Sequence, residues 1–208
     1  MLLPAFAILA LGTVTALSYA QAIPIEFFMK DMAALARVHP FVSVISSLGA
    51  FMYVAAAAIC LFAFSVAARS HGRKPGHLLY GGLLSLYLAI DDFYMFHEFV
   101  LPRYVGIGEK LVYALLAAAI LFFLHRYRSI VMSLDPALLL AALACFGVSV
   151  VSDLLGDGLK LALGRWEFLL EDGMKFIGIS LWAAWFAGAA QRELGPVPVT
   201  AAAPPAAP

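Results

Sequence analysis

Long apolar stretches alternate with short polar stretches along this chain. Six apolar segments are visible, at residues 1–25, 41–68, 75–90, 111–124, 136–152 and 176–190. A helix rises about 1.5 Å per residue, so about 20 residues cross the roughly 30 Å hydrocarbon core of a bilayer. The first two segments are long enough without any charge, whereas the other four need flanking residues to complete a crossing. The pattern predicts an all-α fold, a polytopic transmembrane helical bundle of about six spans.

The six segments predict one membrane-embedded helical domain over residues 1–194. Residues 195–208 are rich in Pro and Ala, which is typical of a disordered tail. The small residues at 18–22 are also compatible with a cleaved signal peptide. Because no Lys or Arg precedes Lys30, we expect the first segment to remain as a helix.

Composition narrows the class of protein further. The chain of 208 residues is 64% hydrophobic and only 12% charged, which excludes a soluble globular enzyme and a disordered chain. Its 13 basic and 13 acidic residues balance, so nucleic acid is not an expected partner. Cys60 and Cys145 both lie inside apolar runs, so they predict no disulfide framework. Membrane lipid is the expected partner, and a homo-oligomer or partner subunits in the membrane are compatible with this composition.

The charges divide unequally between the two predicted faces of the membrane. Basic clusters at residues 69–74 and 125–128, together with Arg192, lie on one face, and most of the acidic residues lie on the other. Lys and Arg counts on the two faces are similar, so the positive-inside rule gives only a weak preference. The clustered bases place the first face in the cytoplasm. We therefore expect a multi-pass protein of the cell inner membrane with both termini cytoplasmic.

The acidic residues lie at the ends of four predicted spans, at similar depth. A carboxylate deep in a span costs at least about 2.5 kcal/mol, so such groups normally face the bundle interior and pair with each other, with a base or with a cation. Helical spacing puts Asp91 and Glu98 on one face and Asp92 about 100° away. Glu171 and Lys175 are four residues apart, which favours an ion pair on one helix. His77 lies beside a loop boundary and is expected at the interface or in solvent.

A metal-dependent membrane enzyme is the first hypothesis for this cluster. Carboxylates and a histidine on several inward-facing helices can hold a divalent metal ion, the candidate cofactor. The catalytic candidates are Asp91, Asp92, His97 and Glu98. The candidate metal ligands are Asp91, Asp92, His97, Glu98, Glu109, Asp153, Glu171 and Asp172. Lys175 would balance their charge, and a lipid-like substrate would suit a chain without a soluble domain.

Two other hypotheses explain the same residues. The acids could bind or relay protons or cations as part of a translocation component, because burial and like charge hold protons on carboxylates. They could instead form a structural network in a non-catalytic membrane subunit or sensor. That third hypothesis expects an Asp91→Asn change to alter stability more than any activity.

Overall fold

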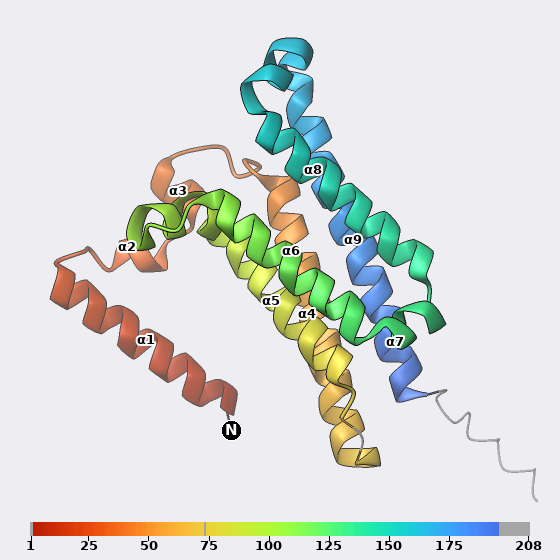
Figure 1. Ribbon diagram of the computed structural model, residues 1–208. Coiled ribbons are helices and arrows are strands. Elements are labelled where there is room, and N and C mark those ends of the chain that lie inside the picture. The colour runs from red at the N-terminus through yellow and green to blue at the C-terminus, as the bar shows by residue number, and fades with distance from the viewer. Residues whose placement is uncertain (1, 73, 196–208) are drawn as a thin grey trace, which may run out of the picture. The chain divides into compact units, whose positions relative to one another are not determined.

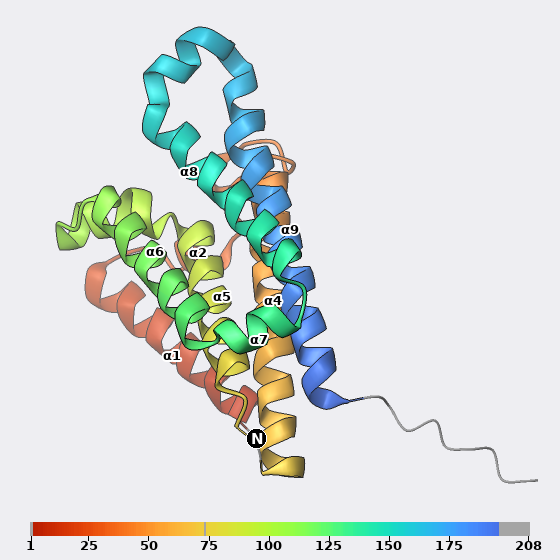
Figure 2. The ribbon, with the colours of Figure 1, turned by 45° about the vertical axis from the view of Figure 1, so that its right-hand side comes forward.

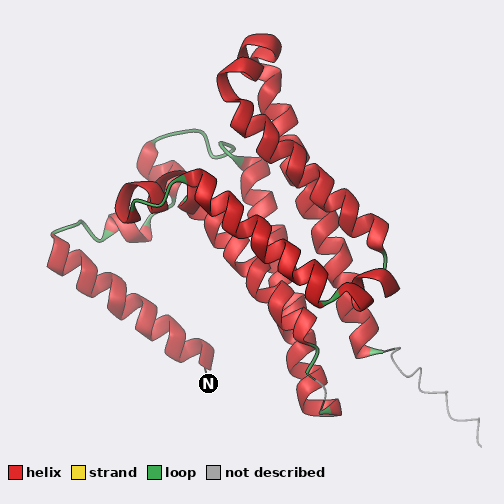
Figure 3. Cartoon of the chain, in the orientation of Figure 1, coloured by secondary structure: helices red, strands yellow, loops and turns green. Residues whose placement is uncertain are grey.

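The structure, a computed structural model, describes residues 2–72 and 74–195. Every regular element in these ranges is a helix, and they contain no strand (Figure 3). The predicted all-α class is therefore confirmed, and each of the six predicted apolar segments falls on a helix. The predicted tail at 195–208 lies outside the described residues except for Gly195.

Residues Met1–Val44 form the first of two compact units. This unit contains α1 (Leu2–Gln21), α2 (Glu26–Met29) and α3 (Met32–Ala36). Two threonine hydroxyl groups of the apolar helix α1 form hydrogen bonds within the helix. Thr13 and Thr15 each donate to the carbonyl oxygen four residues earlier, at 2.8 Å. Such bonds suit a helix in an apolar medium, where no water replaces them.

The second compact unit, Ile45–Pro208, carries the longer helices. Its elements are α4 (Val44–His71), α5 (Gly76–Tyr94), the π-helical η1 (Phe96–Val105), α6 (Glu109–Arg126), α7 (Arg128–Ser133), α8 (Pro136–Leu163), the 3-10 helix η2 (Gly164–Trp166) and α9 (Glu167–Leu194). Helices α8 and α9 run side by side in opposite directions, as do α5 and α6 (Figures 1 and 2). The turn between α8 and α9 gives the unit a helical hairpin.

Large aromatic rings and small residues make the core of this unit. The ring centroids of Trp182 and Phe186 on α9 lie 4.8 Å apart, and Phe123 of α6 lies 5.7 Å from Phe186. Gly81 of α5 faces the ring of Phe186, where any side-chain carbon would overlap it. The glycine therefore lets α5 and α9 approach closely, as small residues do between membrane helices.

Three polar pairs join α5 to α9 at successive levels. From one end to the other they are Asp92 with Lys175, Ser85 with Trp182, and His77 with Glu193. The Nε1–H of Trp182 donates to Ser85 Oγ at 2.9 Å, and His77 Nε2 lies 3.8 Å from Glu193 Oε1. His77 is only 2% exposed, so the expectation of an interfacial or solvated side chain is wrong. His77 is buried because it lies on the face of α5 that contacts α9.

Four helices of the described residues are long and apolar enough to cross a membrane. These candidate spans are Pro4–Gln21, Val44–Ser70, Pro136–Gly156 and Leu161–Leu194. Helices α5 and α6 cover the other two predicted spans but are not among these four. Helix α6 includes Glu109, Lys110 and Arg126 in its 18 residues, and α5 includes Asp91 and Asp92 in its last turn. The structure is thus that of a helical protein with four candidate spans, consistent with a membrane protein.

Candidate functional site

A sharp change of direction at Met95 creates the site. Met95 has a left-handed backbone with φ 51° and ends α5, with its N–H bonded to the carbonyl oxygen of Asp91. On a continuous helix, His97 would lie about 9 Å beyond Asp91 and far around the axis. The turn into η1 brings His97 back over Asp91 instead. The predicted shared face of Asp91 and Glu98 is therefore wrong, because the α-helix ends between them.

Asp91 holds His97 through both of its carboxylate oxygens. The backbone N–H of His97 donates to Oδ1 at 3.0 Å, and the ring Nδ1–H donates to Oδ2 at 2.6 Å. Both residues are buried, with 4% and 6% of their surface exposed. The other ring nitrogen, Nε2, lies 3.4 Å from Oε1 of Glu98, whose side chain is 53% exposed. His97 thus links a buried carboxylate to one that reaches solvent.

The two carboxylates keep a proton on His97. Burial alone lowers the pKa of this imidazole, but the hydrogen bonds and negative charges of Asp91 and Glu98 outweigh it and raise the pKa to about 9. Contact with His97 lowers the pKa of Glu98, and the charges of His97 and Lys175 add to that effect against the opposing burial. At neutral pH the group is therefore a charged imidazolium between two carboxylates.

Tyr113 of α6 connects this group to two further acids. Its hydroxyl lies 2.9 Å from Asp153 Oδ2 on α8 and 3.3 Å from Glu109 Oε1 on α6. A phenol has one proton to donate, so the nearer Asp153 is the better acceptor. The ring of Tyr113 lies 5.2 Å from the ring of His97. Sequence analysis missed Tyr113, although its position four residues after Glu109 puts both on one helix face.

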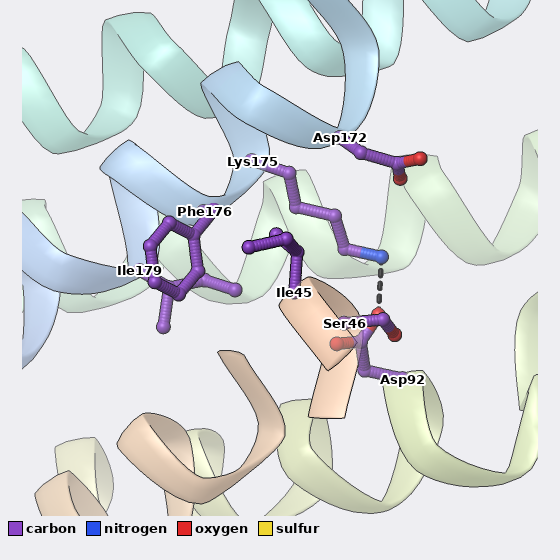
Figure 4. Close-up of a pocket in the computed structure, with 7 residues that line it drawn as sticks. All are labelled: Ile45, Ser46, Asp92, Asp172, Lys175, Phe176 and Ile179. Carbon is purple, nitrogen blue, oxygen red and sulfur yellow. Dashed lines mark hydrogen bonds and ion pairs between the residues drawn. The ribbon is translucent and has the colours of Figure 1, made fainter. Parts of the chain in front are cut away.

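A second group lies where α5 meets α9. Lys175 donates to Oδ1 of Asp92, whose side chain is only 7% exposed (Figure 4). Asp172, one turn earlier on α9, lines the same small cavity. The other oxygen of Asp92, Oδ2, is buried and has no hydrogen-bond partner among the described residues.

The structure distributes the predicted site residues over three groups. Asp91, His97 and Glu98 form the first, Glu109 and Asp153 meet at Tyr113 in the second, and Asp92, Asp172 and Lys175 form the third. Glu171 lies partly buried near the start of α9. Helix α9 thus supplies the single lysine of the site, and α5 supplies Asp91 and Asp92.

The described residues offer no arrangement suited to a metal ion. Among the side chains that the structure describes, no three His, Cys, Asp or Glu residues converge as metal ligands would. Asp91 already uses both oxygens on His97, and one oxygen of Asp92 is taken by Lys175. The hypothesis of a divalent metal cofactor therefore gains no support from this geometry.

One family model matches almost the whole chain. It is described as "Domain of unknown function (DUF8692)" and covers residues 3–189. The chain belongs to this family. No curated protein and no solved structure matches the chain. The matched stretch contains every residue of the three groups. The family description names no function for them.

Proposed function

We propose that this chain is a membrane protein that takes up and releases protons at its buried carboxylate–histidine cluster. The observation that carries the proposal is the contact of His97 Nδ1 with Asp91 at 2.6 Å while Nε2 lies 3.4 Å from the half-exposed Glu98. An imidazole bridging a buried and a solvated carboxylate is suited to pass a proton from one to the other. Because both oxygens of Asp91 accept hydrogen bonds from His97, the geometry favours proton binding over metal ligation.

The surrounding charges support proton binding. Seven carboxylates contribute to the predicted site, against one lysine and one histidine, so the region favours positive charge. Glu98 gives the cluster its contact with solvent, and Asp91 fixes the ring of His97 in one orientation. A proton that reaches Glu98 is then one hydrogen bond away from the ring.

The membrane arrangement completes the proposal. Helix α5 has 19 residues and α6 has 18, which corresponds to about 27 to 29 Å along their axes, close to the thickness of a hydrocarbon core. Counting these two with the four candidate spans gives six spans. We place them in the inner membrane with the basic clusters and both termini in the cytoplasm, so that lipid surrounds the bundle and the acidic cluster faces the opposite surface.

Proton uptake by the purified protein tests this function. Because the pKa of His97 is about 9, lowering the pH from about 10.5 to 7.5 is expected to load about one proton per chain onto this residue. A pH-sensitive dye in weak buffer measures the uptake. His97→Gln should remove this proton, and Glu98→Gln should slow its arrival. Glu26→Gln changes an exposed acid outside the cluster and is the matched control.

Two results decide the proposal. Uptake in the wild type that is unchanged in His97→Gln would contradict it, because the proton would then go elsewhere. After reconstitution into liposomes, a proton gradient that dissipates faster than in empty liposomes, and only with His97 present, would show translocation. Uptake without dissipation would show a one-sided proton sensor or coupling subunit.

A structural network is the second candidate function. The three polar pairs between α5 and α9 favour it, because polar side chains fix the register of membrane helices. In that case Asp91→Asn would lower the stability of the fold, while the proton uptake per folded molecule would not depend on His97. The uptake measurement therefore separates the two candidates.

A further inference from the structure

The two neighbouring aspartates of α5 use their oxygens differently. Asp91 accepts hydrogen bonds from His97 at both oxygens. Asp92 accepts from Lys175 at Oδ1, while its buried Oδ2 has no partner among the described residues. A buried acceptor without a donor costs roughly 1–3 kcal/mol, so natural proteins usually supply a donor. Of the two aspartates, Asp92 is therefore the one whose carboxylate can accept a further hydrogen bond, at Oδ2.

A cavity beside Asp92 has room for that donor. Its volume is about 20 Å³, and its lining residues are Ile45, Ser46, Asp92, Asp172, Lys175, Phe176 and Ile179 (Figure 4). A water molecule needs roughly 10–15 Å³ of such space and two to four polar partners. The carboxylates, the hydroxyl and the ammonium group of the lining provide these partners. The space suits one water molecule and is too small for an organic ligand.

The cavity leads from the surface to the buried carboxylate. Ser46 and Asp172 are exposed, whereas Ile179 is 2% exposed. Helix α4 offers no side-chain donor where Gly49 faces Asp92, since even an added side-chain carbon at Gly49 would lie 3.9 Å from Oδ2. A donor for Oδ2 can therefore be supplied through this cavity.

We propose that the cavity binds one water molecule, which donates a hydrogen bond to Asp92 Oδ2 and bridges it to Asp172 at the surface. This inference rests on the proposed proton function and adds to it a port on the α4 and α9 side, distinct from Glu98. In a transfer, the water gives one proton to Oδ2 as it receives one from Asp172. The water is thus unchanged, and one proton has moved inward.

X-ray radiolysis of the whole protein, read by mass spectrometry, tests for the bound water. Radiolysis converts a bound water into a hydroxyl radical that oxidises its nearest side chains. Ile179 lines the cavity, whereas the equally buried Leu78 does not. With a bound water, Ile179 should be oxidised about ten-fold faster than Leu78. Equal and slow oxidation of Ile179 and Leu78 in the wild type would overturn the proposal.

A pair of matched variants sharpens this test. Ser46→Leu extends an apolar side chain at the cavity and should lower the oxidation of Ile179 to the level of Leu78 and slow proton uptake. Ser47→Leu makes the same change at the next residue, outside the cavity lining, and should do neither. Rapid oxidation of Ile179 in a wild type that takes up no proton would support the water site and contradict the proposed function. Oxidation that persists unchanged in a folded Ser46→Leu protein would contradict the water site alone.

Discussion

The buried polar pairs at the two ends of the α5–α9 helix pair have different surroundings. At one end, Asp92 pairs with Lys175, and both residues line a cavity that opens to the surface. At the other end, His77 pairs with Glu193, and the ring of Tyr127 lies 6.1 Å from the imidazole. Aromatic rings of Phe123, Trp185 and Phe186 follow directly along the core.

We interpret the first end as a place of proton exchange and the second as a contact that attaches one helix to the other. A buried ion pair beside a cavity that opens to the surface can exchange protons with its surroundings, whereas a buried pair packed against aromatic rings chiefly holds two helices together. Charge alone does not distinguish the ends, because both contain an acid and a base. Four experiments test the distinction, in order of decreasing expected effect.

Lys175→Met should have the largest effect. It leaves the buried carboxylate of Asp92 without its counter-charge, which costs about 3 kcal/mol of unfolding free energy, at the lower end of the range for buried pairs because Lys175 is 30% exposed. Denaturant unfolding in mixed micelles measures the change. Lys110→Met, at an exposed residue of α6, is the control and should be nearly neutral. Equal stabilities of the two variants would contradict the pairing of Lys175 with Asp92.

Asp91→Asn should lower stability in a pH-dependent way. Since the pKa of His97 is raised from 6.5 to about 9 in the folded protein, its interaction with Asp91 stabilises the fold fully below pH 6.5 and is lost as the pH rises through about 9. We expect the variant to be less stable by about 2 kcal/mol at pH 6, with the difference shrinking above pH 9. A difference that is constant between pH 6 and 10 would show that His97 does not carry the effect.

The middle pair should matter less. Removing the hydroxyl of Ser85 or the indole N–H of Trp182 ends one buried hydrogen bond, for which about 1 kcal/mol is typical. Trp182→Phe also removes ring volume, so a double-mutant cycle with Ser85→Ala isolates the bond. We expect a coupling energy of about 0.6 kcal/mol, as for other polar pairs between membrane helices. If the effects of the two substitutions on the unfolding free energy simply add, the hydrogen bond between Ser85 and Trp182 does not contribute to stability.

His77→Gln should have the smallest effect. The separation of 3.8 Å from Glu193 exceeds a normal hydrogen bond, and glutamine keeps a polar group at the same place. We expect a loss of about 0.5 kcal/mol, and proton uptake equal to that of the wild type. Reduced uptake in this variant would mean that both ends of the helix pair exchange protons.

The sequence predicted the helices better than it predicted their contacts. Apolar runs locate helices because membrane spans need long uninterrupted stretches, and the two acids predicted at the end of α5 do make polar contacts there. The left-handed turn at Met95 left no signal, since such a backbone usually occurs at glycine, asparagine or aspartate. Helical periodicity, extended past this turn, therefore put Asp91 and Glu98 on one face of a helix that ends before Glu98.

Contacts between different helices could also not be predicted from one sequence. Asp92 and Lys175 are 83 residues apart, and Tyr113 reaches Asp153 from another helix. Such pairs depend on how helices pack and at which register, and periodicity describes only one helix at a time. Spacing along one helix suggested Glu171 as a neighbour of Lys175, but it could not reveal the contact of Lys175 with Asp92 of α5.

The ionisation of His97 tests the central claim most directly. Nitrogen-15 NMR of histidine-labelled protein, with His97→Gln to assign the resonance, follows both ring nitrogens as the pH is raised. We expect a charged imidazolium at neutral pH that loses its proton near pH 9, and in Asp91→Asn a lower midpoint because only Glu98 then opposes the effect of burial. A neutral His97 ring at pH 7 in the wild type, or the same titration in both proteins, would contradict it.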